Sequence, residues 1–216
     1  MAGTVYNPAH EFFQGVYDFE HASGSFEVYL RPGGRFFAPK YQAGGSKWDI
    51  EPRDSGRVLT IAWGKFGKYE LAVVDEEART FSGSAVGKPE SWRKMAKKRD
   101  FTLAESKLMD SEWELEHEGG KFLVEFRADA YNHFICNDFP DHSHYRVEGG
   151  EGDKPMVYLS WGKYGEYEFT ILPGDDGKWE TMTGHAKGDP KNWRKLKRLA
   201  TLVPGQEDAH AHEHGH

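Results

Sequence analysis

The stretch WGKFGKYEL covers Trp63–Leu71, and a nearly identical stretch, WGKYGEYEF, covers Trp161–Phe169, 98 positions later. Further matches lie on both sides of these stretches in the same order, at spacings that drift only from 96 to 101. They include Tyr17 with Trp113, His21 with His117, Phe26 with Phe122, Pro89 with Pro190, and Trp92 with Trp193. Agreement over so much of the chain predicts two copies of one module, residues 10–103 and 107–203. Residues 204–216 would form a disordered, His-rich tail.

Each copy alternates apolar and polar residues with a period of two. In the first copy the alternation is clear in SFEVYL (25–30), RVLTIAW (57–63) and KYELAVV (68–74). Such alternation is typical of half-buried antiparallel strands separated by turns. We therefore predict an all-β fold of two tandem antiparallel modules, each a small barrel or sandwich of six or seven strands. The quoted stretch would form a hairpin with two glycines in its turn, and its Trp and Tyr rings would close one end of the core.

The last segment of each copy has helical spacing instead. These segments are GKPESWRKMAKKRDF (87–101) and GDPKNWRKLKRLA (188–200). Pro89 and Pro190 suit the first position of a helix, and Asp189 suits an N-cap. We expect each module to end in a short basic helix whose Trp covers the sheet. The apolar face of the first helix would hold Trp92, Met95 and Ala96.

The order of these segments resembles the calycin group of β-barrels, which includes the lipocalins. Gly15-Val16-Tyr17 would open a first strand, hairpins would follow in sequence, and a helix would end the module. The chain departs from the lipocalin pattern, which has Gly-x-Trp at the first strand, and about 95 residues is short for a lipocalin barrel. No binding residue is therefore carried over from that group. The resemblance implies a barrel that could carry a small apolar or aromatic ligand.

The aromatic residues of the repeated stretch are candidates for such ligand binding. Aromatic residues make up 14% of the chain, and seven of them are Trp. Ligand pockets are concave and mostly apolar, with a few polar groups. The candidate ligand-binding residues are Trp63, Tyr69, Trp161 and Tyr167.

Basic residues gather in the two C-terminal segments. Between Lys88 and Arg99, six Lys or Arg residues accompany one acidic residue, and the count between Lys187 and Arg198 is the same. Because the whole chain carries a net charge of -7, positive charge is segregated along the sequence. A protein or polyanionic partner could dock on these segments, whereas the overall acidity argues against a nucleic-acid binder. The candidate partner-binding residues are Arg93, Lys94, Arg194 and Lys195.

The second copy contains HFICNDFPDHSHY (133–145), whereas the first copy has FFAPKYQAGGSKW in the corresponding place. Imidazole, thiolate and carboxylate groups are ligands for zinc, copper or nickel. The asymmetry between the copies supports a transition-metal site in the second module, in a binding protein or a metal-assisted enzyme; the alternative is that hydrogen bonds to neighbouring groups hold these loop histidines. The candidate ligands are His133, Cys136, Asp141, His142 and His144.

Two other groups of histidines lie outside this segment, and different roles are expected for them. His210, His212, His214 and His216 alternate in the tail, a pattern that chelates metals. His21 and His117 occur in both copies, and a repeated His near a strand end is expected to hold a turn by hydrogen bonding.

The sequence contains no nucleophile elbow, phosphate-binding glycine loop or His-Glu-x-x-His helix. We therefore favour a non-catalytic binding or scaffold protein over an enzyme. The start of the chain lacks the pattern of a secretory signal, and no apolar run is long enough to span a membrane. With Cys136 as the one cysteine, we expect a cytoplasmic protein, the alternative being a mature form from which a signal has been removed.

Overall fold

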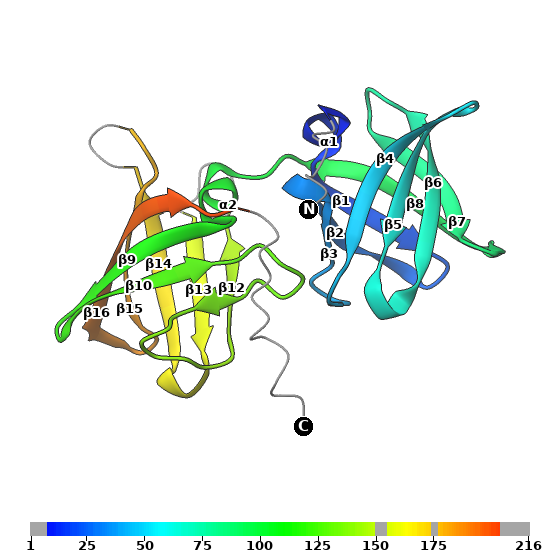
Figure 1. Ribbon diagram of the computed structural model, residues 1–216. Coiled ribbons are helices and arrows are strands. Elements are labelled where there is room, and N and C mark those ends of the chain that lie inside the picture. The colour runs from blue at the N-terminus through cyan, green and yellow to red at the C-terminus, as the bar shows by residue number, and fades with distance from the viewer. Residues whose placement is uncertain (1–7, 150–154, 174–176, 204–216) are drawn as a thin grey trace. The chain divides into compact units, whose positions relative to one another are not determined.

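The computed structural model describes residues 8–149, 155–173 and 177–203, whose regular structure is mostly β-strand with two short α-helices (Figure 1). The chain divides into two compact units. Of the described residues, the first unit holds those up to Thr102 together with Ala128–Asn132, and the second holds Leu103–Arg127 and those from His133 to Val203. The predicted all-β fold of two tandem antiparallel modules is confirmed.

The first unit is a closed barrel of eight antiparallel strands, each paired with its neighbours in sequence. Its core is formed by the side chains that alternate inward, such as Phe19, Leu59 and Leu71. The strands are β1 Gly15–His21, β2 Gly24–Arg31, β3 Arg35–Phe37, β4 Lys47–Arg53, β5 Gly56–Ala62, β6 Lys68–Asp75, β7 Thr80–Ala85 and β8 Lys88–Arg99.

The second unit is an eight-stranded sheet in the order β11-β10-β9-β16-β15-β14-β13-β12. Its two edge strands, β11 and β12, meet at an isolated bridge between His133 and His144, which completes a second barrel. In the part of the chain that the structure describes, each module thus has eight strands, not six or seven. The strands are β9 Ser111–His117, β10 Gly120–Phe126, β11 Phe134–Ile135, β12 Ser143–Glu148, β13 Met156–Trp161, β14 Glu166–Leu172, β15 Thr181–Ala186 and β16 Asp189–Thr201.

The repeated stretch forms the predicted hairpin in both barrels. In the first, the Trp63 N–H donates to the Gly67 carbonyl at 2.8 Å across the short 3-10 turn η2, Gly64–Phe66. In the second, Trp161 N–H donates to Gly165 O at the same distance across η3, Gly162–Tyr164. The two turns therefore repeat in hydrogen bonding as well as in sequence.

The prediction of a short basic helix at the end of each module is wrong, because both segments are strands. β8 pairs with β7 and β1, and β16 pairs with β15 and β9. The turns before them contain Gly87 and Gly188, whose positive φ angles of 76° and 80° suit a tight hairpin. Pro89 and Pro190 follow these turns and lie near the starts of the strands rather than at helix N-termini.

The alternation of apolar and polar residues that marks a strand is not evident in the sequence of β8 and β16, because most inward positions of these strands hold long cationic side chains. On β8, Arg93 and Lys97 are half-buried on either side of the buried Met95. The Arg93 guanidinium lies over the Tyr69 ring, whereas Lys97 Nζ donates to Gln14 O. Both stems cover apolar surface while their charged ends leave the core. β16 repeats this order with Arg194, Leu196 and Arg198.

Short helices precede the barrels instead of ending them. α1, Pro8–Phe13, comes before β1, and α2, Leu103–Leu108, comes before β9. Phe13 and Leu108 are fully buried against their own cores. Among the described residues, neither helix has the length needed to cross a bilayer.

Candidate metal centre

Three of the five predicted metal ligands come together on the outer face of the second barrel. His133 directly precedes β11, and His144 is the second residue of β12, where it bridges to His133. His142 ends the loop that leads into β12. The neighbours Phe134, Ser143 and Tyr145 are buried, so strand alternation directs His133 and His144 outward.

The imidazoles of His133, His142 and His144 form a compact cluster. One ring nitrogen from each lies within 4.8 Å of the others. The Nε2 atoms of His142 and His144 are 2.8 Å apart, and the His133 and His144 rings stack with centroids 5.1 Å apart. His142 is exposed and the other two are half-buried, so the cluster is open to solvent on one side.

Asp141 lies beside the cluster, but its carboxylate bonds to backbone. Oδ2 accepts from the Lys163 N–H and Oδ1 from the His142 N–H, both at 2.8 Å. These two bonds, the Lys163 bond first, lower the pKa of Asp141. The carboxylate thereby ties the loop carrying His142 to the η3 turn. A Cβ at Gly162 would collide with this carboxylate, so the glycine leaves room for the contact.

Cys136 belongs to the apolar core of the second barrel and is 4% exposed. Burial raises the pKa of its thiol. Because metals bind the thiolate, this environment does not suit a ligand. Its sulfur is not part of the three-histidine cluster.

The first barrel shows what this position looks like without histidine. There β3 and β4 pair only at Arg35 and Lys47, as His133 and His144 pair in the second barrel. Arg35 precedes the core residue Phe36 just as His133 precedes Phe134. The first barrel thus places two permanent cations where the second places imidazoles. The sequence alignment, which sets His133 opposite Phe36, is wrong by one residue at this end, because the loops between the paired residues differ by one residue in length.

The four candidate ligand-binding rings are part of the two cores. Trp63 and Trp161 are each 4% exposed, and their indole N–H groups donate to the Tyr41 and Phe139 carbonyls at 3.0 and 3.1 Å. The Tyr69 hydroxyl donates to Phe66 O, and the Tyr167 hydroxyl to Tyr164 O, both at 3.0 Å. These rings lie against one another and close one end of each barrel.

The four candidate partner-binding cations divide into two pairs. Arg93 and Arg194 turn inward, and their guanidiniums lie 5.3 and 5.1 Å from the Tyr69 and Tyr167 ring centroids. Lys94 and Lys195 are exposed and lie beside acidic residues of the neighbouring strand, since Lys94 pairs with Glu20 and Lys195 with Glu116.

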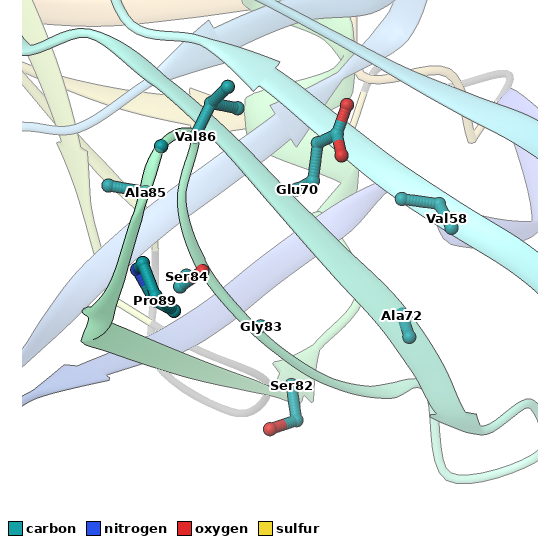
Figure 2. Close-up of a pocket in the computed structure, with 10 residues that line it drawn as sticks. Val58, Glu70, Ala72, Ser82, Gly83, Ser84, Ala85, Val86 and Pro89 are labelled. Atoms are coloured by element: carbon teal, nitrogen blue, oxygen red, sulfur yellow. The ribbon is translucent and has the colours of Figure 1, made fainter.

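A shallow depression of about 400 Å³ lies on the outer wall of the first barrel, across β5 to β8 (Figure 2). Small side chains such as Ala72, Ser82 and Ser84 line it, with Val86 in the β7–β8 turn and Pro89 at the start of β8. Glu70 supplies the charge of this lining, and its Oε1 lies 3.5 Å from Arg53 Nη2. The polar side chains of the lining are Glu70, Ser82 and Ser84.

The two repeated histidines hold turns, as predicted. The Ser23 N–H donates to His21 Nδ1 at 3.3 Å, and the Gly119 N–H donates to His117 Nδ1 at 3.2 Å. The tail histidines, His210 to His216, lie outside the described residues.

Comparison with known proteins finds no matching family model, no similar curated protein and no similar solved structure.

Proposed function

We propose that this chain is a transition-metal-binding protein whose second barrel holds one zinc, copper or nickel ion through His133, His142 and His144. The proposal rests on the single observation that one ring nitrogen of each histidine lies within 4.8 Å of the others. In a tetrahedral site with Zn–N bonds of about 2.0–2.1 Å, ligand nitrogens are about 3.3 Å apart. The Nε2 atoms of His142 and His144, 2.8 Å apart, already lie near that spacing.

The type of ligand favours borderline transition metals. Imidazole suits zinc, copper and nickel, whereas calcium and magnesium prefer oxygen ligands. Asp141 is engaged with two backbone N–H groups and would act as a positioning residue for the loop of His142. Three protein ligands leave a coordination position for water or for a further ligand.

The first barrel supplies a comparison within the same chain. Its equivalent pair, Arg35 and Lys47, carries two positive charges and cannot accept a metal ion. If the fold itself needed histidine at this position, both copies would be expected to carry it. The other functions predicted from the sequence depend on aromatic rings packed in the cores and on lysines that lie beside acidic residues.

The test is isothermal titration with ZnCl2, using a chain whose tail cannot chelate. We call this the tail-silenced chain; it carries His210→Ala, His212→Ala, His214→Ala and His216→Ala. We expect binding of one zinc per chain, and we expect His144→Ala in the same background to weaken it at least tenfold. The matched control is His185→Gln, which removes a half-buried histidine of β15 outside the cluster. Absence of stoichiometric binding, or equal loss in the control, would refute the proposal.

A further inference from the structure

Each barrel is closed at one narrow seam. In the first barrel, β3 and β4 share the single pair Arg35 and Lys47. In the second, β11 and β12 share the single bridge of His133 and His144. Most other neighbouring strands of the second barrel pair along five residues or more, whereas β11 pairs with β10 at only two. The β11–β12 seam is therefore the part of this barrel with the least backbone pairing.

The three imidazoles lie on both sides of this seam. The His133 carbonyl accepts from the Arg127 N–H at 2.8 Å, which fixes His133 on the β11 side. His142 and His144 belong to the other side, and Asp141 ties that side to the η3 turn. An ion bound by all three rings would join the two edge strands through its coordinate bonds.

Core side chains lie directly behind the seam. Phe134 on β11 and Tyr145 on β12 each contact Phe126, at ring-centroid distances of 5.3 and 5.1 Å. Phe134 also lies 4.9 Å from the Trp161 ring. All four rings are less than a tenth exposed, so separation of the seam would open the core to water.

We infer that metal binding at the three histidines locks the seam of the second barrel, so that metal occupancy controls local opening of β11 and β12. This inference rests on the proposed function and adds its consequence for the fold. Binding energy gained only when both sides of the seam are in place stabilises the closed barrel over the opened one. The first barrel, with Arg35 and Lys47 at its seam, has no such control.

The test is hydrogen exchange of the tail-silenced chain, read by mass spectrometry, with excess ZnCl2 and with EDTA. We expect zinc to slow exchange at least tenfold in peptides covering 133–148. Peptides from β14 and β15, and from residues 35–53 of the first barrel, should change much less. At 100 times the dissociation constant, linkage allows slowing on the order of 100-fold.

His133→Ala separates bridging from binding. This variant keeps His142 and His144, whose Nε2 atoms lie 2.8 Å apart, on one side of the seam. We expect zinc at saturating concentration to leave β11 unprotected in this variant, whose fold circular dichroism would check. Should this change unfold the barrel, His133→Gln serves in its place.

The outcomes separate the two claims. If titration shows stoichiometric zinc and exchange at 133–148 does not change, the lock is refuted while the proposed function stands. Equal protection of both barrels would also refute the lock. If zinc does not bind, the proposed function itself fails.

Discussion

Asp141 is a predicted ligand whose carboxylate instead bonds to the His142 and Lys163 N–H groups. We expect Asp141→Ala to weaken zinc binding by about 10- to 100-fold, because the loop of His142 loses its anchor. Titration of the tail-silenced chain measures the effect. Asp141→Asn, which keeps one carbonyl oxygen, should retain more affinity. Unchanged affinity in Asp141→Ala would show that the loop is held by other contacts.

A second residue-scale prediction concerns Gly184 on β15. A Cβ at this position would collide with the Glu168 carbonyl of the neighbouring strand β14, and Gly83 of the first barrel has the same relation to Glu70. We expect Gly184→Ala to lower the free energy of unfolding by about 1–3 kcal/mol, as overpacking does. Urea unfolding in EDTA measures it. Thr183→Ala, at the exposed neighbouring position, should stay within about 0.5 kcal/mol.

The sequence predicted only in part which of the candidate ligands come together. The residue types and the asymmetry between copies marked the segment from His133 to His144. The meeting of His133 with His144 depends on a cross-strand bridge, which local spacing does not reveal. Cys136 is not a ligand because it is buried in the core. Asp141 is not a ligand because its carboxylate accepts from the backbone N–H groups of His142 and Lys163, and the second of these is 22 residues away in the sequence.

The elements β8 and β16 show where a periodic pattern misleads. Trp92, Met95 and Ala96 fit a helical face in the sequence, but only Met95 of the three is buried in the structure. A strand that crosses a small barrel has few positions deep in the core. Its remaining inward positions can hold long cations whose charged ends reach the barrel rims. Pairing with neighbouring strands decided the conformation, not the local spacing.

Substitutions on β8 distinguish the strand from the helix. Met95 is 2% exposed and Trp92 is 37% exposed. We expect Met95→Ala to cost about 2–5 kcal/mol of unfolding free energy, because it leaves a cavity in the core. Trp92→Ala should cost no more than about 1 kcal/mol. The helical interpretation makes Trp92 the core residue, so a larger loss for Trp92→Ala would contradict the strand.

At the scale of the whole molecule, the internal repeat was enough to predict two all-β modules, and the structure has two eight-stranded units. The distribution of charge could not be predicted in the same way. The cations gathered in β8 and β16 lie beside acids of β1, β2 and β9. Lys98, for example, contacts Glu27 at 2.7 Å. Cations that are grouped along the sequence are therefore neighbours of acidic residues across the sheet.

Partner binding through these strands remains a prediction, and the geometry determines how to test it. Arg93 and Arg194 lie over core tyrosines, so their replacement would also affect stability. Lys94→Glu with Lys195→Glu changes only exposed positions. Because neighbouring acids offset the lysines, we expect the unmodified chain to leave a heparin column below physiological salt, and the double variant to elute no later. Strong retention that the double variant abolishes would show that the lysines form a polyanion site.

The central claim is that the second barrel holds a metal ion where its edge strands meet. Anomalous diffraction at the zinc absorption edge, from crystals of the tail-silenced chain grown with one equivalent of ZnCl2, tests it most directly. The account predicts one strong peak per chain, about 2.0–2.1 Å from a ring nitrogen of each of His133, His142 and His144. A peak bound elsewhere, or by only one side of the seam, would contradict the account.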